Sequence, residues 1–298
     1  MPTLQATALI DALNYTFGRH SGARASHAKG INVRGAFTPA TDAAAIVIPA
    51  LQHPQPVHAR FSIGGGKPSI SDKSPTVRGF GLEIGNGPES WRLALISAPV
   101  FFANSAEQFR AFLAARKPDP EIGGPNPERV KAFNAANPNT MPHQLFLAET
   151  PPCRCYSSER YHSGHAYRFG SKAEVFARLM LEPEAGRVGL SVAENDAASD
   201  NFLADQLEQT LSVGEARWTL KLIHANPEDN TQDPTAPWIG SHDETPLGTI
   251  AIRSLSATGD DKVFDPSVFP NGISAPNDAV FALRNPAYAE SYKRRAKQ

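Results

Sequence analysis

The sequence predicts an α+β protein built around an eight-stranded antiparallel β-barrel with flanking helices. Short apolar runs of strand type fall into two groups of about four, and helical and irregular stretches divide the groups. The 26 prolines and 22 glycines lie mostly between these runs, which is typical of a turn-rich β protein. Antiparallel strands joined in this way can close into a barrel, because closure removes the exposed sheet edges.

The length and composition favour one large domain. The chain has 298 residues, of which 41% are apolar, enough for a single large core. We expect an N-terminal helix and arm over residues 1–30 and a barrel with inserted helices over about 31–255. A wrapping segment with a final helix then covers about 256–298.

The first half of the chain begins with a predicted helix over residues 4–18, because apolar residues recur at helical spacing from Leu4 to Leu13. A glycine-containing arm follows as far as Gly30. Ser105 and Gln108 then have the spacing of a capping box, which predicts a helix that ends near Lys117. Between the arm and this helix we expect strands at NVRGAF (32–37), AAAIVIP (43–49), PVHARFSI (56–63), VRGFGLEI (77–84) and WRLALIS (91–97).

The second half starts with a proline-rich, irregular stretch over residues 118–160, with a helical piece near 127–136. Strands resume at HAYRF (165–169) and EVFARLML (174–181), and alternation in the latter places Val175, Ala177, Leu179 and Leu181 on one face. A leucine stripe predicts a helix over about 199–211. The last predicted strands are WTLKLI (218–223) and GTIAIRSL (248–255), and residues from Phe264 onward lead into a final helix.

The charge balance excludes several classes of partner. The net charge is −1, so no strong field would draw the protein to nucleic acid or to an anionic membrane surface. No apolar run reaches 18 residues, which argues against membrane insertion. The N-terminus lacks the pattern of a signal peptide, so we expect a cytoplasmic protein, with the periplasm as the alternative if a leader has been removed. Cys153 and Cys155 are too close for an ordinary structural disulfide, and we interpret them as free thiols.

Arg284 and Tyr288 form the first candidate site, in the stretch LRNPAYAESYKRRAKQ. Residues four apart share one face of a helix, so the guanidinium can lie beside the phenol oxygen. A free tyrosine titrates near pH ~10, and a nearby cation or a ferric ion lowers that value. Tyr288 is therefore a candidate anionic iron ligand. The alternative is a surface arginine with a half-buried tyrosine.

His27, in RASHAKG, is the candidate base on the opposite side of such a metal. An iron that handles peroxide needs one group to take a proton from one oxygen and deliver it to the other. Ser62 could orient the imidazole by hydrogen bonding. The aromatic run at residues 98–102, followed by Phe109, suits a flat macrocycle. The alternatives are a polar loop histidine and ordinary core packing of the aromatic residues.

Together these segments resemble the haem catalase family, specifically its small catalase-related peroxidase branch. The segments that carry the resemblance are RASHAKG, ARFSIGGG, TVRGFGLEI, APVFFANSAEQFRAFLAARKPDP, FDPSVFPNGI and RNPAYAESYKRR, in this order. The resemblance covers most of residues 20–296. It implies a catalase-like haem barrel without the long C-terminal extensions of large catalases, and haem b, with its iron, as the cofactor.

The resemblance also implies a role for each matching residue. His27 matches the distal histidine, Ser62 its orienting hydroxyl, and Tyr288 the proximal ligand of the haem iron, with Arg284 supporting the phenolate. Ser26 stands beside the distal histidine. The remaining matches are Arg24, Arg60 and Arg295 near the propionates or the proximal side, Phe101 and Phe109 as distal aromatics, Gly79 and Phe80 near the haem, and His165 as another haem-side histidine.

Three positions depart from the pattern of large catalases. Ile96 falls where the family has its distal asparagine, and a register shift of one residue would put Ser97 there instead. Ser26 replaces the usual valine, and its hydroxyl could compete for the imidazole. Gly64 replaces a channel valine, and TVRGF is two residues shorter, so we expect a wider access route. Tetramerisation is not carried over, and a homodimer is the default expectation.

The resemblance implies a haem peroxidase. Hydrogen peroxide, and organic hydroperoxides as further substrates, would oxidise the haem to an oxoferryl species, and small organic reductants would reduce it. Weak catalase activity would accompany this reaction. One alternative is a true catalase, and another is a haem isomerase or lyase of lipid hydroperoxides. A non-enzymatic haem-binding protein would keep Tyr288, but His27 argues against it.

Overall fold

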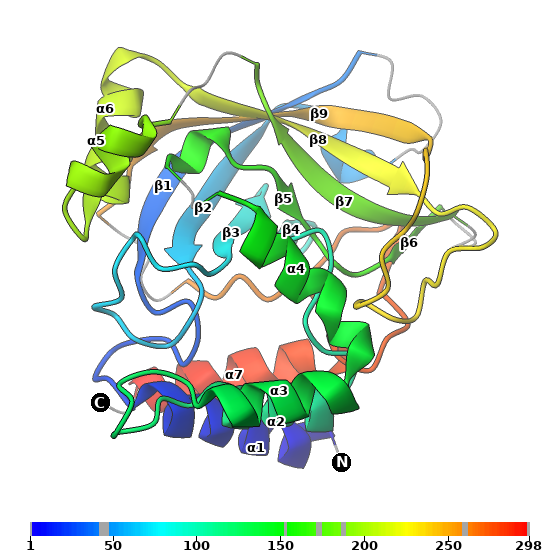
Figure 1. The fold of residues 1–298 in the computed structure, drawn as a ribbon. Helices are drawn as coiled ribbons and strands as arrows, with labels where there is room; N and C mark the ends of the chain where they lie inside the picture. Colours follow the sequence, from blue (N-terminus) through cyan, green and yellow to red (C-terminus); the bar gives the residue numbers. More distant parts are fainter. Residues whose placement is uncertain are drawn as a thin grey trace.

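An eight-stranded antiparallel barrel forms the centre of the computed structural model (Figure 1), which describes residues 2–41, 48–151, 154–170, 175–185, 189–257 and 262–296. Neighbouring strands pair in the order β5-β4-β3-β2-β1-β9-β8, and β7 pairs with both β5 and β8 and so closes the sheet. A short ribbon of β6 and β10 extends from β7. The strands are β1 (Gly30–Pro39), β2 (Gln55–Ile63), β3 (Arg78–Ile84), β4 (Trp91–Ile96), β5 (Tyr161–His162), β6 (Tyr167–Phe169), β7 (Val175–Pro183), β8 (Ala216–His224), β9 (Glu244–Leu255) and β10 (Ile273–Ser274).

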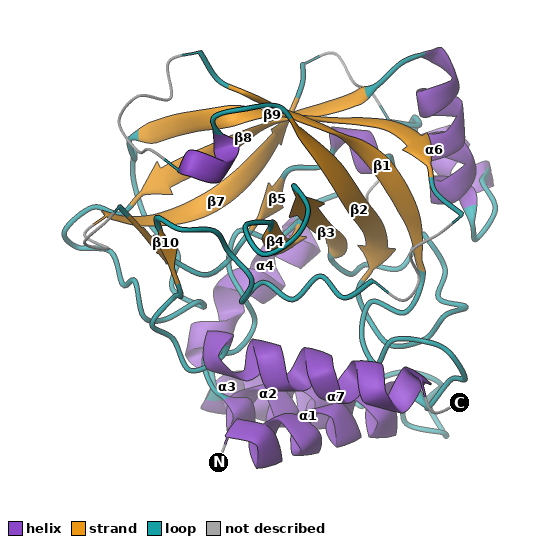
Figure 2. Cartoon of the chain, turned by 180° about the vertical axis from the view of Figure 1, so that it is seen from behind, coloured by secondary structure: helices purple, strands orange, loops and turns teal. Residues whose placement is uncertain are grey.

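Four helices form a layer across one end of the barrel. Figures 1 and 2 show α1 (Pro2–Phe17), α2 (Ala106–Arg116), α3 (Pro127–Ala136) and α7 (Arg284–Ala296) side by side in this layer. The helix α4 (Met141–Glu149) connects the layer to the barrel, and α5 (Val192–Ala197) and α6 (Phe202–Val213) lie at the barrel's side. Short 3-10 turns are Pro49–Leu51, Pro138–Thr140, Tyr156–Ser158 and Phe281–Leu283. The first and last helices of the chain therefore lie against each other.

The barrel interior is packed with aromatic and aliphatic side chains. Alternate residues of each strand point inward, and Phe61 on β2 stacks on Phe80 on β3 with ring centroids 4.3 Å apart. Tyr161 and Trp218 pack against the same pair. The barrel is thus a closed core, and space for a ligand lies at its end, toward the helix layer.

Most expected elements are present, and the predicted eight-stranded barrel is confirmed. The expected strand at residues 43–49 is not supported: 43–47 lie outside the described residues, and Pro49–Leu51 is a 3-10 turn. The short strands β5 and β10 and the helices α4 and α5 were not predicted. Ser105 caps α2 as expected, but the Gln108 side chain accepts from Asn104 N rather than from the capping residue.

Two further expectations concern the cysteines and the membrane. Cys155 is a buried free thiol whose Sγ lies 2.7 Å from Ser157 Oγ, and Cys153 lies outside the described residues. Within the described ranges, none of the helices has both the length and the apolar character needed to span a bilayer.

Candidate active site

A cavity of about 330 Å³ lies between the open end of the barrel and the helix layer. Its wall is built from segments far apart in the sequence: α1, the arm after it, strands β2 to β4, helices α2 and α4, and α7. His27, on the arm, and Tyr288, on α7, both line it. The fold therefore brings together the two residues that the sequence proposed as the opposite sides of one metal site.

The arm that carries His27 is fastened to strand β2. Arg60 and Ser62 are two residues apart on this strand and share a face. Arg60 donates to the main-chain oxygens of His27 and Ala28, each at 2.9 Å. The Nδ1 atom of His27 lies 3.0 Å from Ser62 Oγ. His27 has a φ of 52°, the only positive value among the described residues other than glycine, so these contacts hold an unusual backbone conformation.

Gly79 makes room for the histidine. It lies opposite Ser62 in the β2–β3 pair. A Cβ atom at this position would stand 2.5 Å from Ser62 Oγ and 2.6 Å from His27 Nδ1, well inside van der Waals contact. The imidazole therefore packs directly on the main chain of β3, and only glycine fits there.

His27 is held in the neutral form. Burial, followed by the nearby charge of Arg60 and then of Arg284, lowers the pKa of His27 to about 4. A neutral imidazole has one nitrogen that can accept a proton. Because Nδ1 faces Ser62, Nε2 is the ring nitrogen that remains for a ligand in the cavity.

A hydrogen-bonded chain leads to Tyr288 from the other side. The Nδ1 atom of buried His165 lies 2.9 Å from Asp278 Oδ2, and Asp278 Oδ1 accepts from Phe281 N at 2.7 Å. Nη2 of Arg284 lies 2.8 Å from His165 Nε2. Arginine can only donate, so Nε2 accepts and Nδ1 carries the proton given to Asp278. Arg284 in turn interacts with the phenol of Tyr288 on the same helix face.

The balance of effects at Tyr288 differs from the expectation. Desolvation by the surrounding protein raises the pKa of Tyr288, and Arg284 offsets only part of that rise. Arg284 lowers this pKa as expected, through its charge and its hydrogen bond, but desolvation has the larger effect on the pKa in the protein by itself. Burial removes water from the phenolate. The guanidinium of Arg284, which also donates to His165, does not replace that water. A positively charged metal at the oxygen would have to supply the remainder.

Ile96 lies in the cavity wall at the end of β4, where it pairs with Gly79. The neighbouring Ser97 does not line the cavity, because its Oγ accepts from Arg78 N at 3.0 Å. The structure thus places the isoleucine, rather than the serine, beside the histidine-bearing face. The alternative register with Ser97 at this position is not supported.

The predicted aromatic residues separate into two groups. Phe101 and Phe109 line the cavity, with ring centroids 5.7 Å apart in an edge-to-face arrangement. Phe102 adds a third ring, 4.4 Å from Phe101. Phe80 also borders the cavity, but it is fully buried and stacks inside the barrel on Phe61. Its main contribution is therefore to the core.

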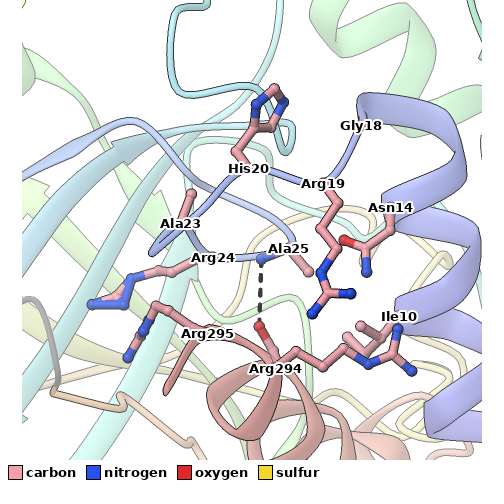
Figure 3. Close-up of a pocket in the computed structure, with 11 residues that line it drawn as sticks. Ile10, Asn14, Gly18, Arg19, His20, Ala23, Arg24, Ala25, Arg294 and Arg295 are labelled. Carbon is pink, nitrogen blue, oxygen red and sulfur yellow. Dashed lines mark hydrogen bonds between the residues drawn. The ribbon is translucent and has the colours of Figure 1, made fainter. Parts of the chain in front are cut away.

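Basic side chains gather where the arm passes α7 (Figure 3). Arg24 and Arg295 border both the main cavity and the small adjoining pocket drawn there, and Arg19 and Arg294 line the small pocket. Arg24 Nη2 donates to Lys262 O at 3.1 Å, and Ala25 N donates to Ser291 Oγ at 3.4 Å. This edge of the cavity is suited to carboxylate groups.

The structure changes one expectation about the access route and one about the hydrogen bonding of His27. An added Cβ at Gly64 would stand 2.6 Å from Thr76 Oγ1 and 3.0 Å from Val77 Cγ2. The space that a larger residue would take is therefore already filled, and the expectation that Gly64 widens the route by leaving it open is wrong. Ser26 lines the cavity, but Ser62 is the hydroxyl bonded to His27 Nδ1.

Sequence reasoning missed two residues near the site. Asp278 was not proposed, whereas Phe102 belongs to the aromatic run that was expected at residues 98–102. His143, on the unpredicted helix α4, is buried in the cavity wall. A single histidine between Pro142 and Gln144 gives no signal of its own in the sequence. Only the fold shows that His143 borders the cavity. The described residues contain no cluster of three or more His, Cys, Asp or Glu that could bind a bare metal ion.

Comparison with known proteins places this fold in one class, the catalase-type barrel. The Catalase family model matches residues 1–297. The chain belongs to the catalase family. It is 32% identical over 298 residues to a protein of Synechococcus elongatus named catalase-related peroxidase, covering 97% of this chain and 88% of that protein.

Other relatives agree with this membership. A catalase-related peroxidase of Mycolicibacterium paratuberculosis is 31% identical over 301 residues, with 96% of this chain and 93% of that protein covered. Catalase A from Saccharomyces cerevisiae superposes with a TM-score of 0.81 at 19% sequence identity, which shows the fold. The match covers 93% of this chain and 62% of the yeast chain, so the chain spans less than two thirds of that larger catalase.

Proposed function

We propose that the protein is a haem-dependent peroxidase that reduces hydrogen peroxide at the expense of small organic donors, with weak catalase activity. The observation that carries this proposal is the pairing of neutral His27 with Ile96 across from Tyr288 in one cavity. Membership of the catalase family and the names of the two relatives at 32% and 31% identity support it.

The residues of the cavity fit a haem, for which haem b is the proposed form. Tyr288 would offer its phenol oxygen to the haem iron, and Arg284 beside it has a buried Nε with no hydrogen-bond partner among the described residues. Arg24 and Arg295 supply positive charge at one edge for the two propionates. Phe101 and Phe109 offer apolar faces for the ring. When bound, the haem would supply the iron that exchanges electrons with peroxide.

His27 is the proposed acid–base residue. Its neutral ring could take a proton from one oxygen of hydrogen peroxide and deliver it to the other oxygen. Ser62 and Gly79 fix the ring, and Arg60 fixes the main chain that carries it. This arrangement keeps the imidazole in one orientation without needing a charged partner.

Ile96 favours reduction of peroxide by another donor over dismutation. Dismutation requires a second peroxide molecule to be held and oxidised in the same pocket. An isoleucine side chain cannot form hydrogen bonds, and Ser97 is engaged with Arg78 N. At position 96 the cavity wall therefore offers no hydrogen-bond partner for positioning a second peroxide.

A true catalase is the second candidate, because the buried hydrogen-bonded groups that lead to Tyr288 are compatible with either reaction. The chain Asp278–His165–Arg284–Tyr288 does not depend on the residue at position 96. The two candidates differ in the fate of the second peroxide and therefore in whether oxygen is released.

The proposal is tested by reconstituting the protein with haem and comparing it with two variants. Tyr288→Phe removes the axial oxygen and should lose haem during gel filtration. His27→Ala should retain haem and consume peroxide roughly a hundredfold more slowly, a loss typical for an acid–base residue. If Tyr288→Phe retains haem as firmly as the wild-type protein, the ligand assignment is wrong. If His27→Ala reacts with peroxide at the wild-type rate, the base is another group.

A further inference from the structure

The cavity has two chemically different lobes. Arg24, Arg60 and Arg295 line the part formed by the arm, β2 and α7. The opposite side, which we call the aromatic lobe, is formed by α2 and α4 and is lined by Phe102, Phe109, Phe112, Leu113, His143 and Leu147. Among the described residues, no lysine or arginine lines the aromatic lobe, and Arg116, which lies 3.8 Å from the centroid of the Phe112 ring, does not itself border the cavity. A ligand in this lobe would therefore be uncharged and largely apolar.

The rings of the aromatic lobe are closely packed around Phe102. Its centroid lies 4.5 Å from that of Phe109, 4.4 Å from that of Phe112 and 5.6 Å from that of His143. The contacts with Phe109 and His143 are edge-to-face. Such walls favour a flat ring as the ligand, because a further ring can join the same stacked and edge-to-face arrangement.

His143 is the polar group of this lobe. It is 3% exposed, and its Nδ1 lies 2.8 Å from the main-chain oxygen of Val100. A carbonyl oxygen only accepts, so Nδ1 carries the ring proton and Nε2 has a free lone pair. Within the described part of the chain, Nε2 has no hydrogen-bond partner. Burial lowers the pKa of His143, which keeps the ring neutral and Nε2 an acceptor.

An imidazole nitrogen in the wall of a largely apolar cavity offers a ligand one hydrogen-bond acceptor. We propose that the aromatic lobe binds a neutral phenol as the reducing donor, with the phenolic O–H donating to Nε2 of His143. The ring would lie among Phe102, Phe109 and Phe112. The binding site follows from the cavity alone, and the phenol's part as reductant rests on the proposed peroxidase function.

The electron balance of this role is simple. Hydrogen peroxide is the oxidant, and breaking its O–O bond to form two waters takes two electrons and two protons. Two phenols supply these in turn, each losing one electron and the proton of its O–H bond and leaving as a phenoxyl radical. The Nε2 atom of His143 is the first acceptor of that proton. His143 is thus suited to donor oxidation, whereas His27 serves the peroxide.

Binding is tested directly by calorimetry on the haem-loaded protein, with 4-methylphenol as the probe and toluene as the matched molecule without a hydroxyl. His143→Asn keeps a donor for Val100 O but has no group at the position of Nε2. His143→Gln places an amide near that position. We expect 4-methylphenol to bind the wild-type protein more tightly than toluene, and His143→Asn to weaken it roughly tenfold, the value of one buried hydrogen bond.

Under this proposal toluene binds wild type and His143→Asn equally, and His143→Gln recovers part of the phenol affinity. Equal phenol affinity in wild type and His143→Asn would overturn it, as would toluene binding as tight as that of 4-methylphenol. Turnover adds a second readout: KM for 4-methylphenol rises more in His143→Asn than in His143→Gln. A protein that binds the phenol but never reacts with peroxide would instead overturn the proposed function and leave the site itself intact.

Discussion

Arg284 and His165 meet at 2.8 Å between Nη2 and Nε2, although 119 positions separate them in the chain. This contact joins the start of α7 to the segment before β6 and fixes the ring orientation of His165. The Nδ1 proton is then directed to Asp278, whose side chain is 1% exposed. The geometry at Tyr288 is thus set by a chain of buried groups rather than by Arg284 alone.

Replacing Asp278 with asparagine should destabilise the protein. The carboxylate accepts from both His165 and Phe281 N, whereas an amide has only one accepting oxygen, so one buried donor loses its partner or shares it. We expect the free energy of unfolding in urea to fall by about 1–3 kcal/mol. Glu208→Gln, on the exposed face of α6, is the matched control and should change it by less than ~0.5 kcal/mol. Equal effects of the two variants would contradict this account of the buried chain.

Adding one methyl group at position 79 should displace the distal histidine. In Gly79→Ala the new Cβ would meet Ser62 Oγ at 2.5 Å and His27 Nδ1 at 2.6 Å. We expect haem to stay bound while peroxide consumption slows by at least roughly tenfold, because the base leaves its position. Gly124→Ala, where a Cβ meets no atom within 4 Å, is the control and should keep the wild-type rate. An unchanged rate in Gly79→Ala would show that His27 does not act from this position.

The pH profile of peroxide consumption should follow the lowered pKa of His27, about 4. The ring is neutral above that value and charged below it, so the rate should be level from pH ~8 to ~5.5 and fall as the pH approaches 4. An ordinary imidazole would produce the fall near pH ~6.5. Far-UV circular dichroism at each pH checks that the fold persists. A midpoint near 6.5 would mean that the histidine is more accessible to water than the structure shows.

The lowered pKa of His27 also predicts how the free energy of unfolding changes with pH. Between pH ~6.5 and 4 the unfolded imidazole binds a proton that the folded one does not. The free energy of unfolding should therefore decrease as the pH falls through this window, with the full stabilisation present above it. Urea midpoints at pH 7.5 and 5 measure this change, and His27→Gln should reduce it. A wild-type midpoint that does not fall at pH 5 would contradict the shift.

Ile96→Asn should change the products of the reaction. An amide in the cavity wall beside His27 would give a second peroxide a hydrogen-bond partner. We expect oxygen release per peroxide consumed to rise several-fold, as measured with an oxygen electrode. Ile96→Val keeps an apolar wall and is the control. If the asparagine variant releases no more oxygen than the valine variant, the side chain at position 96 does not decide between the two reactions.

The barrel could be predicted from the sequence, and His27 and Tyr288 could be proposed as site residues, because both inferences depend on local patterns. Strand alternation from Val175 to Leu181 and the cap at Ser105 are both readable in a few consecutive residues, and both are confirmed. The motifs around His27 and Tyr288 identified the family in the same way. The placement of these two residues in one cavity then follows from the fold.

What could not be predicted depends on contacts between distant segments. Strands β5 and β10 have two residues each, too few for a periodic signal, and they exist only because β4, β7 and β6 offer free edges to pair with. Asp278 gains its role from His165 across the fold. The raised pKa of Tyr288 could not be foreseen, because spacing reveals the neighbouring charge but not how much water the surrounding protein removes.

The central claim is tested most directly by adding hydrogen peroxide to the haem-loaded protein in the presence of 4-methylphenol and following oxygen and phenol together. The account predicts that most of the peroxide consumed oxidises the phenol and that little oxygen appears. Oxygen release at half a mole per mole of peroxide, the stoichiometry of dismutation, with the phenol left unoxidised, would contradict it and identify a true catalase.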